Sequence, residues 1–356
     1  MTPRRILIQH PHKPNEISGV TTYVDVLADA LNDLGHATQT ISSSQSSLRA
    51  RFAAVRSSEI VHLNSNDLWM LAVSKILRKR VVLKLHYLTY QSLHFAYTPM
   101  AFAERIGAEI RFLWATYGKT KRRRVFFEAT ARLALRVAVM LSVDHVAACS
   151  NFLAESTGLK RVSTIYNPAG PTRDYVAPAT TRPPAICFVG RLSRDKGCDL
   201  LLEAVASIRL VDSPVLIAGV GEEMRALRDQ AAALGLKNVE FLGQLSASEV
   251  SDLLRSALVL VVPSRWQEPA GYTPVEASLN ECPSIASRVG GLPETAGPHS
   301  LYFERESVAE LARWLTFAVE NRAAMREIGA SSKKYAERKF APLVIAGEFL
   351  QAADVR

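Results

Sequence analysis

Short apolar runs alternate with amphipathic segments along nearly the whole chain. In the first half, runs typical of buried strands occupy residues 5–10, 36–40, 60–63, 81–85, 145–148 and 162–166. Between them, apolar residues recur at helical spacing, most regularly over residues 20–34. Such alternation predicts a doubly wound α/β domain built around a mostly parallel sheet.

A second series of the same kind follows a stretch rich in proline, alanine and threonine, which has the composition of a linker. Its predicted strands are residues 185–189, 215–218, 239–242, 257–262, 284–286 and 300–303. Its predicted helices are residues 200–209, 222–234, 247–255, 274–279 and 308–320. We therefore expect two Rossmann-like domains, residues 1–170 and 185–339, joined by a linker at residues 171–184 and facing each other across a cleft.

Composition narrows the class of protein. The chain has 356 residues, of which 48% are hydrophobic and 22% charged, as is typical of a globular protein with two domains. A net charge of +9 favours an anionic partner. The four cysteines are widely spaced without a metal-ligand pattern, and neither a signal peptide nor a membrane-spanning run is predicted. Together these features predict a cytoplasmic protein.

The stretch after the predicted strand at residues 257–262 holds two carboxylates, Glu268 and Glu276, eight positions apart. Thr273-Pro-Val-Glu276 is typical of a helix start, with Thr273 as the cap and Glu276 at the third helical position. In one interpretation Glu276 completes a capping box and Glu268 is a solvated loop acid. In the other, both carboxylates bind sugar hydroxyls while the helix start holds a diphosphate between them.

Cations follow the first predicted strand of the second half. In Gly190-Arg-Leu-Ser-Arg-Asp-Lys-Gly197, Arg191 and Lys196 are placed to neutralise a departing diphosphate at the mouth of the sheet, or they are charges on a surface turn. The glycines of residues 215–221 lack the third member of a dinucleotide fingerprint, so no nicotinamide or flavin site is predicted. Asp-x-Asp occurs nowhere, so Arg, Lys and helix ends are expected to replace a metal.

The first half offers three weaker signals. Gly19 permits close approach of a ligand to backbone, or it belongs to a ligand-free turn. His86 follows a predicted strand, where it is either a ligand-binding or a structural histidine. Residues 99–141 mix aromatic side chains with the run Lys119-Thr-Lys-Arg-Arg-Arg124, which suits a helix on an anionic membrane surface, or a solvated turn between helices. No nucleic-acid-binding module surrounds these charges.

Three motifs together closely resemble the retaining, metal-independent glycosyltransferases of the GT-B fold, in the group 1 (family 4) class. They are Phe188-Val-Gly-Arg-Leu-Ser-Arg-Asp-Lys-Gly197, then Pro263-Ser264 with Glu268-x7-Glu276, then Pro283-Ser-Ile-Ala-Ser-Arg-Val-Gly-Gly-Leu-Pro-Glu294. Their order and spacing span roughly 110 residues. The first half matches more loosely, and the family's last helix, here about residues 340–356, returns to the first domain.

The resemblance implies a role for each matching position. Arg191 and Lys196 would hold the donor diphosphate, helped by backbone amides near Gly271, Tyr272 and Thr273. Glu276 would bind the ribose hydroxyls and Glu268 the transferred sugar, and His86 would lie beside the sugar's 6-position. Gly19 would approach the phosphates or the acceptor. No cofactor or metal is implied, because catalysis is then mostly positioning and charge stabilisation.

The leading hypothesis is a glycosyltransferase that moves a sugar from a UDP- or GDP-sugar to a lipid-linked or polysaccharide acceptor. Such an enzyme would work in the cytoplasm, at the inner face of the membrane if residues 119–124 bind anionic lipid. One alternative is another enzyme on the same fold, such as a sugar phosphorylase or a nucleotide-sugar epimerase. A further alternative is a non-catalytic protein that binds anions through the same basic run.

Overall fold

The structure is a computed structural model that describes residues 2–12, 19–94, 97–118, 123–170, 184–209 and 213–354. The chain forms two compact units, one of residues 1–170 with 340–356 and the other of residues 171–339. Almost all of the predicted linker, residues 171–183, lies outside the described residues. Within the described ranges, none of the helices is both long and apolar enough to cross a membrane.

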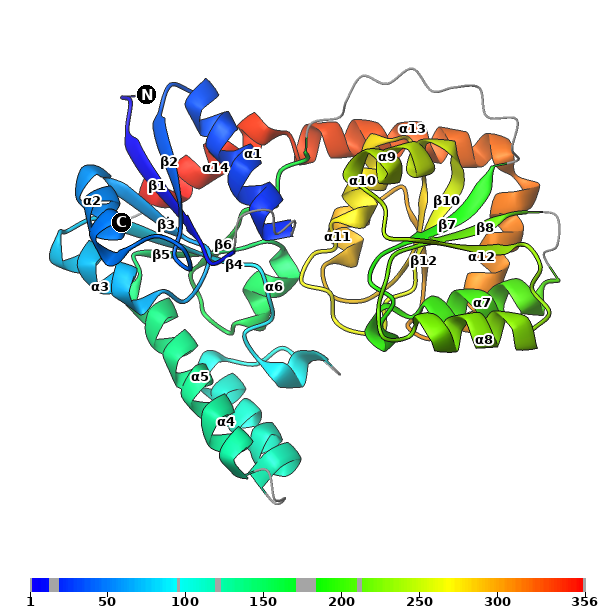
Figure 1. Cartoon of the computed structure of the whole chain (residues 1–356), viewed down its shortest axis with the longest axis horizontal. Coiled ribbons are helices and arrows are strands. Elements are labelled where there is room, and N and C mark those ends of the chain that lie inside the picture. The colour runs from blue at the N-terminus through cyan, green and yellow to red at the C-terminus, as the bar shows by residue number, and fades with distance from the viewer. Residues whose placement is uncertain are drawn as a thin grey trace. The chain divides into compact units, whose positions relative to one another are not determined.

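The first unit is built on a parallel sheet, which in the described residues has six strands in the order β2-β1-β3-β4-β5-β6 (Figure 1). The strands are β1 (Arg5–His10), β2 (Ala37–Ser42), β3 (Ile60–Leu63), β4 (Arg80–Leu85), β5 (His145–Ala148) and β6 (Val162–Thr164). The strand order reverses between β1 and β3. Because α/β sheets bind ligands beyond the carboxyl ends of strands at such a point, these ends are the expected position of a site.

Helices cover both faces of this sheet. α1 (Gly19–Asp33) and α14 (Pro342–Asp354) pack together on one face, and α2 (Leu48–Ser57) and α3 (Leu68–Ile76) lie on the other with the end of α5 (Arg123–Ser142). The remaining helices of this unit are α4 (Phe102–Leu113), α6 (Asn151–Ser156) and the short turns η1 (Gln91–His94) and η2 (Trp114–Gly118).

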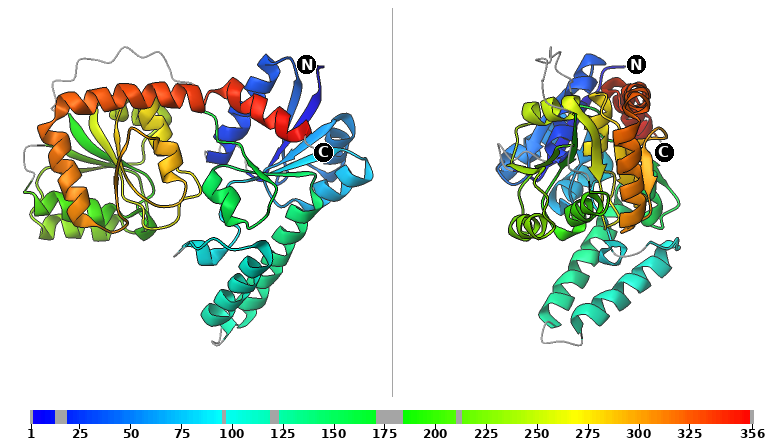
Figure 2. Two further views of the ribbon diagram at one scale, coloured as in Figure 1. Left: turned by 180° about the vertical axis from the view of Figure 1, so that it is seen from behind. Right: turned by 90° about the vertical axis from the view of Figure 1, so that its right-hand side faces the viewer.

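A helical hairpin formed by α4, η2 and α5 projects away from the sheet of the first unit (Figures 1 and 2). Its base is held by Glu109, whose carboxylate is buried and accepts hydrogen bonds from the backbone N–H groups of Gln91 at 2.7 Å and Ser92 at 3.0 Å. The hairpin is therefore fixed at its base, while its far end lies away from the core of the unit.

The second unit contains another parallel sheet, whose described strands are ordered β12-β11-β10-β7-β8-β9. They are β7 (Ala185–Val189), β8 (Val215–Ala218), β9 (Val239–Gly243), β10 (Ala257–Val262), β11 (Ser284–Ser287) and β12 (Leu301–Phe303). Here the order reverses between β7 and β10. The loops that leave these two strands are the two segments singled out in the sequence, residues 190–197 and 263–272.

One face of the second sheet is covered by α7 (Cys198–Ser207), α8 (Met224–Ala233) and α12 (Val308–Glu320). The other carries α9 (Ala247–Ser256) and α10 (Thr273–Leu279). The turn η3 (Arg194–Lys196), α11 (Leu292–Ala296) and α13 (Arg322–Lys339) complete the unit. The sequence did not predict α13, which packs against α10 through buried small residues, among them Gly329 and Ser332.

Candidate active site

The loops after β7 and β10 meet in a buried ion pair. The ammonium Nζ of Lys196 donates to the carboxylate oxygen Oε1 of Glu268 at 2.5 Å, and the hydroxyl of Ser264 donates to the same oxygen at 2.8 Å. Only 4% of Glu268 is exposed, so the interpretation of this residue as a solvated loop acid is wrong. A charge buried this deeply needs a partner, and Lys196 provides it.

Close backbone contacts set the position of both loops. Gly197 has a left-handed φ of +69°, and a Cβ there would lie 2.0 Å from the carbonyl oxygen of Pro263. Gly290 has φ of +52°, and a Cβ there would lie 2.2 Å from the carbonyl oxygen of Glu268. A side chain at Gly197 would therefore push the loops after β7 and β10 apart, and one at Gly290, in the loop after β11, would displace the segment that carries Glu268. The Glu268 carbonyl also accepts a bond from Gly291 N at 2.7 Å.

Arg265 fastens the loop after β10 to the loop after β7. Its guanidinium makes a bidentate ion pair with Asp199, at 2.5 and 2.7 Å, and a second pair with Glu306 at 3.1 Å. Its backbone N–H donates to the carbonyl of Asp195 at 2.8 Å. Bidentate arginine–carboxylate pairs are geometrically demanding, so this contact fixes the segment that carries Glu268.

Several residues of this arrangement were missed in the sequence. Ser264 was noted only as part of a motif, and the pairing of Arg265 with Asp199 joins residues that are 66 positions apart. The Lys196 ammonium also lies 5.2 Å from the ring centroid of Trp266, within the range of a cation–π contact. A signal was available for Ser264 alone, because small polar residues directly after a buried strand often serve a site.

Arg191 stands apart from the buried pair. Its side chain is 62% exposed and makes an ion pair with Asp195 at 3.2 Å. An exposed pair of this kind contributes little to stability, so it can exchange for another anion at small cost. Arg191 is thus an exposed cation on the same loop as Lys196, and it can exchange its partner for another anion. Lys196 is paired with the buried Glu268.

The start of α10 differs from the expectation. Tyr272 precedes the helix as its N-cap, no side chain caps it, and Glu276 occupies the fourth position instead of the third. The capping-box interpretation of Glu276 and the assignment of Thr273 as cap are therefore wrong. The reason is local: Gly271, with φ of +83°, makes the turn, and Tyr272 already has helical dihedral angles.

The carboxylate of Glu276 makes no hydrogen bond or ion pair with any residue that the structure describes. Burial raises the pKa of Glu276 to about 7. An acid kept in such surroundings without a protein partner is a candidate for binding a ligand. It lies one helical turn after Gly271 and Tyr272, and a ligand shared by these residues stays a prediction.

In the first unit, His86 lies just beyond β4 and is only 8% exposed. Its Nε2 is 2.8 Å from the side-chain oxygen of Asn64, which follows β3. The Asn64 amide nitrogen donates to the backbone carbonyl of Gln9 at 2.9 Å. The carboxyl ends of β1, β3 and β4 are thus joined by one chain of hydrogen bonds, at the point where the strand order reverses.

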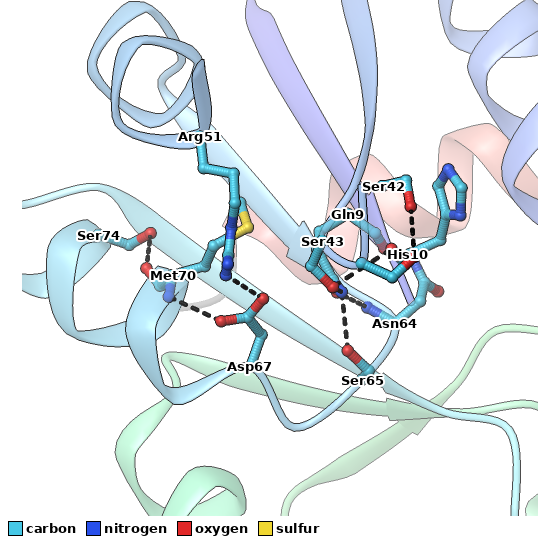
Figure 3. Close-up of polar contacts among 11 residues, drawn as sticks. Gln9, His10, Ser42, Ser43, Arg51, Asn64, Ser65, Asp67, Met70 and Ser74 are labelled. Carbon is cyan, nitrogen blue, oxygen red and sulfur yellow. Dashed lines mark hydrogen bonds and ion pairs between the residues drawn. The ribbon is translucent and has the colours of Figure 1, made fainter. Parts of the chain in front are cut away.

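Gln9 extends this network to neighbouring loops. Its side-chain nitrogen donates to the hydroxyls of Ser43 at 2.9 Å and Ser65 at 2.7 Å, as Figure 3 shows. Its side-chain oxygen accepts from Asn64 N at 3.1 Å. Gln9 is fully buried, so the polar groups at this edge of the sheet hold each other in one arrangement.

A buried cation lies two residues before His86. The Lys84 ammonium donates to the carbonyl oxygens of Ile165 and Tyr166 and lies 4.0 Å from the ring centroid of Tyr23. Burial lowers the pKa of Lys84 to about 7. A lysine inside an apolar strand was a visible signal in the sequence that no prediction used.

Gly19 is the first residue of α1, and no heavy atom lies within 4 Å of a Cβ built on it.

Comparison with known proteins relates the second unit to a family and the whole chain to a fold. Residues 176–335 match the family model of the glycosyl transferases group 1. A crystal structure of the Anabaena protein Alr3699/HepE in complex with UDP and glucose matches with a TM-score of 0.70 and 16% identity, covering 98% of each chain. The second unit of this chain thus matches the group 1 glycosyl transferases over nearly its whole length. The chain as a whole has the GT-B fold, as predicted.

Curated relatives match this chain over part of their length. D-rhamnosyltransferase WbpZ of Pseudomonas aeruginosa is 35% identical over 163 residues, which are 42% of this chain and 42% of the relative. The GDP-mannose-dependent monoacylated alpha-(1-6)-phosphatidylinositol monomannoside mannosyltransferase of Corynebacterium glutamicum is 29% identical over 170 residues, 45% of this chain and 44% of the relative. The alignments thus span less than half of either relative.

The raised pKa of Glu276 predicts how stability depends on pH. In the folded protein Glu276 keeps its proton up to about pH 7, whereas in the unfolded chain it loses the proton near its ordinary pKa of 4.5. As pH rises from 4.5 to 7, the unfolded chain therefore releases this proton while the folded protein still holds it. The contribution of Glu276 thus lowers the free energy of unfolding over this pH range. Glu276→Gln should therefore stabilise the ligand-free protein at pH 8 by about 3 kcal/mol and have little effect at pH 4.5. Urea unfolding at both pH values measures the difference. Glu240→Gln, at an exposed position, is the control.

Proposed function

We propose that this protein is a retaining, metal-independent glycosyltransferase that uses a UDP- or GDP-sugar. The observation that carries the proposal is the Lys196–Glu268 pair at the switch point of the second sheet, where a cation for a diphosphate and an acceptor for sugar hydroxyls are held side by side. The protein named HepE was crystallised with UDP and glucose, which supports the choice of donor class.

In this proposal the charge of the leaving nucleoside diphosphate is neutralised by Lys196 and Arg191, with the backbone amides of Gly271, Tyr272 and Thr273 as further donors. Glu276 accepts from the ribose hydroxyls. Glu268 holds the transferred sugar through Oε2, because Oε1 is already occupied by Lys196 and Ser264.

Transfer then requires no protein nucleophile. The acceptor hydroxyl attacks the anomeric carbon from the face that the nucleotide leaves, the bond to the diphosphate oxygen breaks, and a phosphate oxygen takes the hydroxyl proton. The chain contributes orientation and fixed positive charge. His86 and Gly19, in the first unit, are assigned to the sugar's 6-position and to the phosphates or acceptor.

The proposed acceptor is a lipid-linked saccharide or a polysaccharide at the inner face of the cytoplasmic membrane. The name of the Corynebacterium relative specifies a phosphatidylinositol mannoside acceptor, which supports a lipid-linked class. Residues 99–142 carry nine Lys or Arg and three Glu, a net charge of +6 out of the chain's +9. Most of the excess positive charge is therefore concentrated in the segment that forms the projecting hairpin.

The hairpin also exposes large apolar side chains. Phe127 is 67% exposed and Trp114 45%, while the Arg124 side chain is 91% exposed. Exposed aromatic and cationic groups on one projecting element suit contact with an anionic lipid surface. Of the basic run, residues 119–122 lie outside the described residues.

Two substitutions separate the binding of the nucleotide from the transfer of the sugar. Lys196→Gln should weaken UDP or GDP binding in EDTA by about ten- to a hundredfold, because a charge-assisted hydrogen bond is lost. Glu268→Gln keeps Lys196 and frees it from the ion pair, so it should bind the nucleotide at least as well as the wild type and yet lose about a hundredfold or more of turnover. Isothermal titration calorimetry and nucleotide-release assays measure the two effects.

Lys237→Gln, which changes an exposed lysine of the same unit, controls for net charge. Unaltered binding in Lys196→Gln would contradict the assigned role, provided that its melting temperature shows a folded protein. Epimerised donor without acceptor, or turnover that requires inorganic phosphate, would favour an epimerase or a phosphorylase instead.

Membrane contact has its own test. Replacement of Lys121, Arg122, Arg123 and Arg124 by Ser should reduce co-sedimentation with vesicles of phosphatidylglycerol and phosphatidylcholine in low salt by at least about tenfold, since each cation near an anionic surface contributes about 1 kcal/mol. The loss should shrink as salt is added.

A matched set of four exposed cations of the second unit, Arg225, Arg228, Lys237 and Arg326, provides the control when changed to Ser. Equal losses in both sets would show attraction by net charge alone. No loss in the hairpin variant would refute the membrane contact.

A further inference from the structure

The orientation of the Asn64 amide determines which proton His86 carries. Asn64 is 93% buried, and its nitrogen Nδ2 donates to the backbone carbonyl of Gln9, which can only accept. The oxygen Oδ1 must then be the atom that faces His86 Nε2 at 2.8 Å. Because an amide oxygen only accepts, Nε2 of His86 carries a hydrogen.

The groups around His86 oppose a second proton. Burial lowers its pKa well below the ordinary value, and Lys84 on β4, His62 on β3 and His12 beyond β1 lower it further. The ring of Tyr23 on α1 packs edge-on against it, with centroids 5.0 Å apart. The imidazole is therefore neutral, with its one hydrogen on Nε2, and Nδ1 is a bare acceptor with no partner among the described residues.

Gln9 keeps the whole arrangement from reversing. Its side-chain oxygen must face the backbone N–H of Asn64, which can only donate, so its side-chain nitrogen faces the hydroxyls of Ser43 and Ser65 (Figure 3). A flipped Asn64 amide would place its oxygen against the Gln9 carbonyl, so that two acceptors would face each other in a buried site. A change of the His86 tautomer would not relieve this contact, so the amide keeps its orientation.

We propose that Asn64 is a positioning residue that fixes the Nε2–H tautomer of His86, so that this site offers the ligand a hydrogen-bond acceptor, Nδ1, and no cation. Such a site accepts a sugar hydroxyl and rejects a carboxylate at the same position. The preferred ligand is thus a neutral sugar, not a uronic acid. This specificity rests on the proposed function, in which His86 lies beside the sugar's 6-position. The assignment of the tautomer does not depend on the proposed function.

Nuclear magnetic resonance tests the tautomer independently of any activity. In protein labelled with ¹⁵N in the histidine rings, long-range ¹H–¹⁵N spectra at pH 7 should show His86, assigned by its loss in His86→Gln, as neutral with its hydrogen on Nε2. A hydrogen on Nδ1, or an imidazolium, would overturn the proposal. In Asn64→Asp the new carboxylate should stabilise the imidazolium, and the His86 signals should become those of the charged ring at pH 7.

Donor discrimination tests the consequence. Wild-type protein should use UDP-glucose or GDP-mannose at least about a hundredfold better, in kcat/KM, than the matching UDP-glucuronate or GDP-mannuronate, since a bare acceptor facing a carboxylate leaves both unpaired. Asn64→Asp should narrow that ratio by about tenfold or more, and Asn64→Gln should keep it if its ring spectrum stays neutral. An unchanged ratio beside an altered ring spectrum would refute the specificity role. Failure of all four donors would instead count against the proposed function.

Discussion

The structure depends on one buried contact between charges, the pair of Lys196 and Glu268. Each residue comes from a loop that leaves a strand next to the reversal of strand order in the second sheet, and the two meet at 2.5 Å. A carboxylate that is 4% exposed persists only because a cation and the Ser264 hydroxyl satisfy it. Gly197 and the pairing of Arg265 with Asp199 let the loops after β7 and β10 approach each other this closely, and Gly290 lets the loop after β11 pack against Glu268.

The same constraint has a consequence for ligand binding. Lys196 balances Glu268 when no donor is present, so an arriving diphosphate must compete with a carboxylate for the same ammonium group. Arg191 is also paired with a carboxylate, that of Asp195, but the Arg191 side chain is 62% exposed, so this contact can be exchanged at smaller cost. In the first unit, by contrast, the contacts that join Gln9, Asn64 and His86 at the sheet edge are hydrogen bonds between uncharged groups.

Much of the fold was predictable because parallel strands buried on both faces are continuous apolar runs. The strands at 60–63, 145–148, 185–189 and 257–262 were predicted with the residues observed. α13 was missed because its buried face consists of small residues such as Gly329 and Ala336, which give no apolar periodicity. Tertiary pairings, such as Lys196 with Glu268, could not be derived from spacing, because they depend on which strands become neighbours. Resemblance to a family suggested the residues, and the fold brings them together.

The central claim is that fixed protein charge, led by Lys196, takes the place of a divalent ion at the nucleoside diphosphate. Crystals soaked with UDP or GDP in EDTA test it most directly. The account predicts a pyrophosphate bound within hydrogen-bonding distance of the Lys196 ammonium and the Arg191 guanidinium, with the Lys196–Glu268 distance longer than 2.5 Å. A pyrophosphate far from both cations, or one that binds only when a metal is supplied and is chelated by it, would contradict the account.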